Sequence, residues 1–230
     1  MNFHKNNKHI LIILLVLIAI ALIGKSMTPK PLDTPIVEEI PMATTTEPVE
    51  EAPMTQSNGI ITFAVPKDFG LALTVDQIMN KHYIPSCDNT FDYCLYYNGT
   101  KYDGTNFESA GLRIKNRTDL KTVATCLNTS PDSFPGLKSQ VVASTTSYMV
   151  ASFPGIGDAG AGHYASGEFF RLAYDGTCHE FETRVGATQF LNFPAGTKRE
   201  FTGDDSIALR KELRDIITNS TLRGGEKLSF

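Results

Sequence analysis

Hydrophobic and polar residues follow three successive patterns along this chain. Residues 10–24 form an uninterrupted apolar run, ILIILLVLIAIALIG. Residues 28–58 are rich in proline, threonine and acidic residues. From residue 59 onward, short stretches alternate between apolar and polar positions, which is typical of β-strands with one buried face. The patterns therefore divide the chain into an apolar segment, a linker and one folded domain.

The apolar run is interpreted as a transmembrane signal anchor over residues 10–27, with the lipid bilayer as its partner. A helix over the run spans roughly 22 Å, and the flanking residues Lys8 and Lys25 can extend to the headgroups of a core about 30 Å thick. Basic residues precede the run, so residues 1–9 are expected to remain cytoplasmic and the domain to lie outside the cytoplasm. The alternative is a cleaved signal peptide and a secreted domain, because the Ala-Ile-Ala at 19–21 resembles a cleavage site.

The segment at 28–58 is expected to be an extended linker, because it has too little apolar surface to offset the entropy of ordering. The folded domain is then expected to cover 59–222, followed by a loose tail at 223–230. The whole chain has a formal net charge of −4. Without a basic excess, nucleic acid is not an expected partner.

Alternating positions predict strands within the domain, at 60–65, 69–74, 93–97, 107–115, 141–142 and 148–153. In the fourth of these, Arg113 and Lys115 are predicted to face solvent. The clearest hairpin covers 167–185 and turns at Asp175-Gly176. A two-residue turn predicts that Arg171 pairs with Glu180 and Phe170 with Phe181, with apolar side chains on one face and charged side chains on the other.

Two segments show helical periodicity. The first is expected to begin at Thr118, with Asp119 in its first turn and an apolar stripe of Leu120, Val123, Ala124 and Leu127. The second covers 204–218, is capped by a Thr202–Asp205 capping box and has a stripe of Leu209, Leu213, Ile216 and Ile217. The predicted fold is an α+β domain, in which two amphipathic helices pack on an antiparallel sheet.

Four cysteines fit a disulfide framework, because the domain is predicted to lie outside the reducing cytoplasm. Of the three possible pairings, a local Cys87–Cys94 bridge is favoured, which leaves Cys126 to pair with Cys178. No C-x-x-C pair occurs, and the histidines lack ligand spacing with the cysteines, so no metal or cofactor is predicted.

Glycines at 155, 157 and 160 match the G-x-G-x-x-G string of dinucleotide sites, but the residues that follow predict a strand where such a site needs a helix. These glycines are instead predicted to form a flexible loop. Three weak catalytic candidates lie in this predicted loop or shortly after it: Asp158, His163 and Glu168. They could perform acid–base chemistry or hold a cation. His179 lies on the apolar face of the hairpin and is interpreted as structural.

The layout of anchor, linker and small domain, with the strings CDNTFDYCLYYNGTKYDGTNFESAGLRI and GHYASGEFFRLAYDGTCHEF, resembles uncharacterised membrane-anchored envelope proteins of small-genome bacteria. The resemblance covers most of 59–222. It implies an extracytoplasmic location and no particular activity.

Three functions follow as hypotheses. The first is a binding or interaction module that contacts an envelope component or another protein. The second is an envelope hydrolase that uses Asp158 and His163, although no nucleophile motif is found in the sequence to support it. The third is a passive structural spacer.

Overall fold

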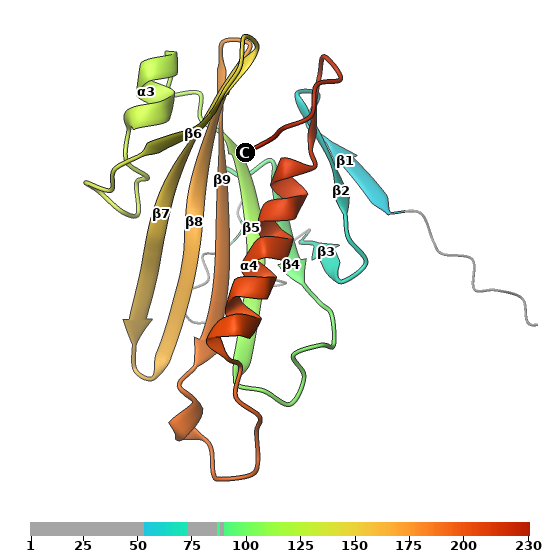
Figure 1. Ribbon diagram of the computed structural model, residues 1–230, viewed down its shortest axis with the longest axis vertical. Helices are drawn as coiled ribbons and strands as arrows, with labels where there is room; N and C mark the ends of the chain where they lie inside the picture. The colour runs from blue at the N-terminus through green and yellow to red at the C-terminus, as the bar shows by residue number, and fades with distance from the viewer. Residues whose placement is uncertain (1–52, 73–86, 88–89) are drawn as a thin grey trace, which may run out of the picture. The chain divides into compact units, whose positions relative to one another are not determined.

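Ten strands and two α-helices form the part of the chain that this computed structural model describes, which comprises residues 53–72, 87 and 90–230 (Figure 1). The strands are β1 (Met54–Ser57), β2 (Ile61–Val65), β3 (Phe69–Leu71), β4 (Tyr93–Tyr97), β5 (Phe107–Asn116), β6 (Gln140–Ser144), β7 (Tyr148–Gly160), β8 (His163–Tyr174), β9 (Thr177–Thr188) and β10 (Thr221–Leu222). The helices are α3 (Val123–Asn128) and α4 (Gly203–Thr218), with a short 3-10 helix, η1 (Phe190–Asn192).

The named strands pair antiparallel in two sheets. The larger has the order β3-β4-β5-β9-β8-β7-β6, and the smaller has the order β1-β2-β10. The expected α+β class is therefore confirmed in its general form, as a mostly antiparallel sheet with few helices. Within the described residues, no helix has the length and apolar character needed to cross a membrane. The expected anchor at 10–27 lies outside these residues.

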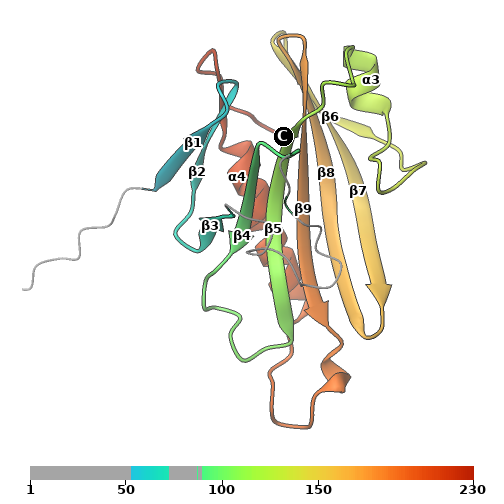
Figure 2. The ribbon, with the colours of Figure 1, turned by 180° about the vertical axis from the view of Figure 1, so that it is seen from behind.

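The central hairpin has the predicted register. Tyr174 pairs with Thr177 across the Asp175-Gly176 turn, and Arg171 pairs with Glu180. Side chains of β8 and β9 therefore alternate between two faces. One face carries Phe170, Leu172, Phe181 and Val185, and it packs against α4. We call it the α4 face, and Figure 2 shows the strands from the other side.

Helix α4 begins and packs as its sequence predicts. Thr202 is the N-cap, and its side chain and that of Asp205 form the reciprocal hydrogen bonds of a capping box. The buried residues of the helix are those of the predicted stripe: Leu209, Leu213, Ile216 and Ile217. Burying such side chains contributes on the order of 1.5–3 kcal/mol each, so α4 is a main source of stability for the sheet.

The first helix differs from the prediction. α3 starts after Thr122, four residues later than expected, and covers only six residues. The reason is local: the carboxylate of Asp119 binds the Arg117 guanidinium at 2.7 Å and 2.9 Å and is not part of the helix. The shift also changes the buried side, since Cys126 is buried whereas Val123 is 53% exposed.

The second face of the large sheet, here called the α3 face, holds buried charges. Arg171 is completely buried, and Glu180, Glu182 and Arg184 are almost so. The prediction of a solvent-exposed side for β5 was therefore wrong at Arg113, which is mostly buried and forms an ion pair with Glu182. Alternation predicted which side chains share a face but not what covers that face.

Both predicted ends of the domain need correction. β1 lies within the residues assigned to the linker and pairs with β2, so the fold begins before residue 59. At the other end, 223–230 is not loose. Leu228 is buried, its N–H donates to the Ser220 carbonyl at 3.0 Å, and the Phe230 ring lies 5.1 Å from that of Phe170.

Candidate functional site

The three candidate catalytic residues lie in strands and do not form one centre. The glycine string belongs to β7, so the predicted flexible loop at 155–160 is absent. Asp158 pairs with Ala165 across β7 and β8 and lies on the α3 face, where its carboxylate is 3.2 Å from the Arg184 guanidinium. Glu168 lies on the α4 face, where both its carboxylate oxygens accept hydrogen bonds from Arg214 of α4.

His163 has a different set of neighbours. Its Nδ1 is 2.7 Å from a Glu108 carboxylate oxygen, and the Thr188 hydroxyl donates to the same oxygen at 2.6 Å. Thr188 approaches the imidazole at Nδ1, the nitrogen that Glu108 also binds. For a histidine to activate a hydroxyl nucleophile, the hydroxyl must contact the imidazole nitrogen that the carboxylate does not bind. The geometry thus orients an imidazole but does not assemble an activated hydroxyl.

A cleft of about 270 Å³ lies at the end of the sheet where β8 turns into β9, among three segments far apart in sequence. Its walls are the start of α3, the turn between β6 and β7, and the turn between β8 and β9. The lining residues are Leu120, Lys121, Thr122, Val123, Thr145, Thr146, Ser147, Tyr148, Met149, Ala173, Tyr174, Asp175, Gly176 and Thr177. The volume is just below the range of pockets that hold small ligands.

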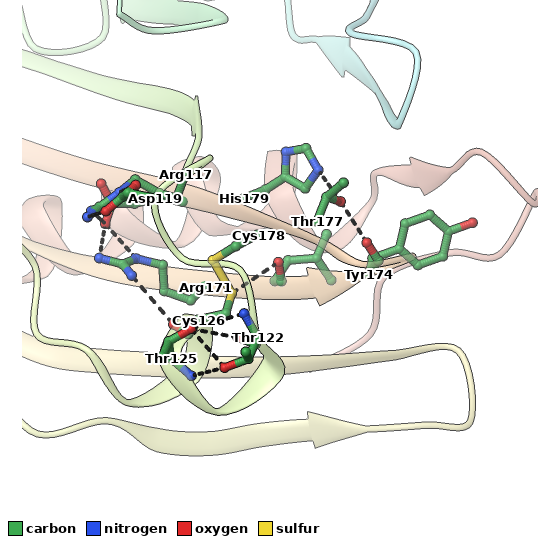
Figure 3. The surroundings of a disulfide bond; sticks show 12 residues. Arg117, Asp119, Thr122, Thr125, Cys126, Arg171, Tyr174, Thr177, Cys178 and His179 are labelled. Atoms are coloured by element: carbon green, nitrogen blue, oxygen red, sulfur yellow. Dashed lines mark hydrogen bonds and ion pairs between the residues drawn. A yellow bond between two sulfur atoms is a disulfide. The ribbon is translucent and has the colours of Figure 1, made fainter.

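A disulfide fixes the helix that forms one wall of this cleft. Cys126 of α3 is bonded to Cys178 of β9, with the two Cα atoms 5.6 Å apart (Figure 3). The completely buried Arg171 adds a second tie, because its Nη1 donates to the Cys126 carbonyl at 3.4 Å. The capping box of Thr122 and Thr125 closes the first turn of α3. A six-residue helix is not stable alone, so these ties hold the wall in place.

An ionic cluster holds the segment that leads into α3. Arg117 binds Asp119, Asp132 and Glu180, and Glu180 also forms an ion pair with Arg171. The hydrogen bonds from Arg117 lower the pKa of Asp119 to about 2, and the same contact raises the pKa of Arg117. Burial lowers the pKa of Arg171, while Glu180 acts in the opposite direction. Each buried charge thus has a partner of opposite sign.

The second half of the cluster lies further along β9. Glu182 forms ion pairs with Arg113 and Arg184, and Arg184 also binds Asp158. Gly167, beside Arg184, leaves no room for a larger residue, since a Cβ there would lie 1.9 Å from the Thr183 carbonyl oxygen. The charges of this face bind one another, which makes them structural and leaves the cleft as the better candidate for a ligand.

Hydroxyl groups line the rim of the cleft, and several are fixed by the fold. Thr177 donates to the Tyr174 carbonyl at 2.6 Å and contacts Nε2 of His179 at 3.0 Å. The Thr145 hydroxyl accepts from the backbone N–H groups at the start of β7. Asp175 forms an ion pair with Arg223. Among the lining residues, all of them described, Lys121 is the charged side chain without an ion pair.

His179 contacts this rim through the Thr177 hydroxyl. It is completely buried, as its interpretation as a structural residue requires, and burial lowers its pKa although the charge of Asp92 opposes the shift. The Thr177 hydroxyl already donates to a carbonyl, so it accepts from His179 Nε2–H. The remaining nitrogen, Nδ1, has no hydrogen-bond partner among the described residues.

Both predicted disulfides are present. Besides the Cys126–Cys178 bond, Cys87 is bonded to Cys94, with the two Cα atoms 6.0 Å apart. In the described part of the chain, no group of three or more His, Cys, Asp or Glu side chains could hold a metal ion. The cleft itself was not predicted. Its residues were recognisable as turns, by Asp175-Gly176 and by the Ser-Thr-Thr-Ser string at 144–147, but nothing in the sequence shows that these turns meet α3.

No protein-family model matches the chain, and no curated protein matches it either.

Proposed function

We propose that this chain is a membrane-anchored extracytoplasmic binding module, and that the cleft beside α3 is its ligand site. The observation that carries the proposal is the construction of the cleft: a helix too short to be stable alone is held at its edge by a disulfide and a buried arginine. Two disulfides in the domain are compatible with a location outside the reducing cytoplasm. The proposed anchor at 10–27 supplies the attachment to the bilayer, with the domain on the far side.

The lining favours a hydroxylated ligand that carries a carboxylate. Hydroxyl groups both donate and accept, so a rim of threonine, serine and tyrosine side chains suits the hydroxyl groups of a sugar. The apolar patch of Leu120, Met149 and Ala173 can contact the less polar face of such a ring. Lys121 adds one positive charge that no side chain of the described residues neutralises. Envelope glycans with carboxylate groups combine these features.

Binding explains the arrangement better than the two alternatives. A hydrolase would need Asp158 and His163 to share a site, whereas each is occupied by a different partner. A passive spacer would need no cleft and no fixed wall. The binding proposal accounts for both the cleft and its fixed wall.

The test is a thermal-shift screen of the full-length chain in detergent, with soluble peptidoglycan fragments, neutral oligosaccharides and carboxylated oligosaccharides as probes. A ligand at 100 times its Kd stabilises by about 2.7 kcal/mol, which raises the Tm of a domain of this size by roughly 5–10 °C. We expect such a shift with the carboxylated probes and a smaller one with the neutral probes.

Lys121→Gln is the diagnostic variant. It should weaken binding of the carboxylated probe by about threefold, which is what an exposed charge contact contributes, and leave the neutral probe unchanged. Lys67→Gln is the matched control, because Lys67 is exposed and lies outside the cleft lining. The absence of a shift with every glycan, or equal effects of the two variants, would reject this cleft as a glycan site.

A further inference from the structure

Half of β7 has an open edge. Its first residues pair with β6, from Met149 to Ser152. A bulge then interrupts the strand between Phe153 and Ile156, where Gly155 adopts a positive φ of 76°. Beyond the bulge, residues 156–160 pair with β8 on one side, and no strand of the described part of the chain pairs with them on the other.

The register shows which backbone groups the open edge presents. The Tyr148 carbonyl accepts from Thr145 N–H, so it points away from β8, and alternate residues of β7 do the same. The bulge adds one residue and shifts this alternation. After the bulge, Ile156 and Asp158 point their backbone groups toward β8. Gly157 and Ala159 therefore direct their N–H and C=O groups outward.

The glycines of this strand leave space beside the backbone. A Cβ built on Gly155 would meet nothing within 4 Å, and one on Gly157 would meet only the Ala165 carbonyl oxygen, at 3.4 Å. Natural proteins protect exposed edges with lysine and other charged residues, with proline and with bulges. Residues 156–160 contain no lysine or proline, and their protection is limited to Asp158 and to the bulge that precedes them. The outward backbone groups thus lack a partner strand within the described part of the chain, and Gly157 leaves room beside them.

We propose that this edge binds an extended peptide segment of another protein, which adds to the sheet as an antiparallel strand. Two residues of the peptide exchange hydrogen bonds with Gly157 and Ala159, which is the recognition mode of strand addition. Their side chains then lie on the α4 face, over the space that the glycines leave. Large β-branched or aromatic residues are favoured at these two positions.

The residue between those two lies opposite Asp158, on the α3 face. Asp158 is the charged group of residues 156–160, and its side chain is 40% exposed although its carboxylate also binds Arg184. Directly opposite positions of paired strands favour unlike charges. A lysine or arginine is therefore expected there, so the peptide has a basic residue between two bulky apolar ones.

The same geometry disfavours a second copy of this chain as the occupant. Suppose that two copies paired through this edge and used the N–H and C=O groups of both Gly157 and Ala159. Gly157 of one copy would then pair with Ala159 of the other. That register places the two Asp158 side chains opposite each other, and like charges there are destabilising.

The experiment uses the full-length chain in detergent and a fluorescent peptide, acetyl-Thr-Val-Lys-Val-Thr-amide. Binding is followed by anisotropy, and hydrogen exchange of the Gly157 and Ala159 amides is followed by NMR. We expect the peptide to bind and to slow exchange at both amides. A peptide with glutamate in place of lysine should bind about tenfold more weakly, as attraction is replaced by repulsion. A peptide with N-methylated valines should not bind.

Two variants separate the charge from the backbone contacts. Asp158→Asn should reduce the difference between the lysine and glutamate peptides to less than about twofold. Ala159→Pro removes one outward donor, leaves the β7–β8 hydrogen bonds intact and should abolish binding; a thermal melt of each variant verifies that it folds.

The proposal is overturned if the Gly157 and Ala159 amides are already protected in the free protein, or if the N-methylated peptide binds as well as its parent. It is equally overturned if the chain forms a dimer that Ala159→Pro dissociates, because a second copy then occupies the edge. Cleft binding of glycans is measured separately, so either proposal can fail alone.

Discussion

On the α4 face of the large sheet, strands β5, β8 and β9 present aliphatic and aromatic side chains to α4 and to the small sheet. On the α3 face, the same three strands present Arg113, Arg171, Glu180, Glu182 and Arg184. Both faces are covered. The first is stabilised by removing apolar area from water, whereas the second combines matched charges with a smaller apolar cluster that includes Phe153 and Phe169. The comparison teaches that burial alone does not describe the role of a face.

The two kinds of contact differ in what they contribute. Apolar burial gives stability with little directional preference. Buried ion pairs recover most of their desolvation cost and little more, but each requires its partner in a defined position. We infer that the α4 face supplies most of the stability, whereas the α3 face determines where α3 and its cleft lie.

The largest effect is expected on the apolar face. Leu213→Ala should lower the free energy of unfolding by about 4 kcal/mol, because the side chain is completely buried and its loss leaves a cavity. Urea denaturation measures the change. Ile207→Ala on the same helix is the control, and it should cost less than about 0.5 kcal/mol because Ile207 is 58% exposed. Equal costs would contradict the packing of α4.

A smaller but more diagnostic effect is expected on the charged face. Arg171→Met should cost about 3 kcal/mol, because Glu180 stays buried with only Arg117 as its partner. The double variant Arg171→Met/Glu180→Leu should recover most of this loss, since a buried ion pair can be replaced by apolar residues at little cost. If the double variant is less stable than Arg171→Met, the charged face contributes stability and our distinction is wrong.

Acidity should affect the α4 face through His179. Burial lowers the pKa of His179 below the ordinary value of 6.5, so the unfolded chain takes up a proton before the folded chain does. The contribution of the neutral imidazole is therefore fully present above pH 6.5 and is lost as the pH falls below that value. Urea titrations between pH 7 and pH 5 should show a smaller decline in stability for His179→Gln than for the parent. Parallel curves would contradict this.

The smallest effect is expected at the edge of the charged face. Arg117 lowers the pKa of Asp119 from 3.8 to about 2, so the stabilisation that Asp119 provides is present above pH 3.8 and is lost as the pH falls toward 2. Because the Asp119 side chain is 60% exposed, solvent screens the pair, and Asp119→Asn should cost less than about 1 kcal/mol at pH 7. The cost should vanish near pH 2, and a constant cost would point to another role.

Sequence patterns predicted those parts of the fold that depend on neighbours in the chain. The Asp175-Gly176 turn determined the register of β8 and β9, and the spacing of Thr202 and Asp205 determined the start of α4. Both are local relationships, so one sequence suffices to find them.

Features that depend on distant segments were not predictable. Alternation placed Arg171 and Glu180 on one face, but what covers them is a segment far away in the sequence. The start of α3 was missed because Asp119 binds a side chain outside the helix. The cleft is built from three turns that only the folded sheet brings together, and the glycines of β7 fit an edge strand as well as they fit a loop.

The central proposal is that the domain, with its two disulfides, lies outside the reducing cytoplasm. Its most direct test is the oxidation state of the four cysteines in intact bacterial cells that express the full chain, measured by maleimide-polyethylene glycol labelling before and after reduction. A variant that lacks residues 1–27 is the control and should carry free thiols. We predict no labelling of the full chain before reduction and four additions after it. Labelling before reduction, at the level of the control, would contradict the claim.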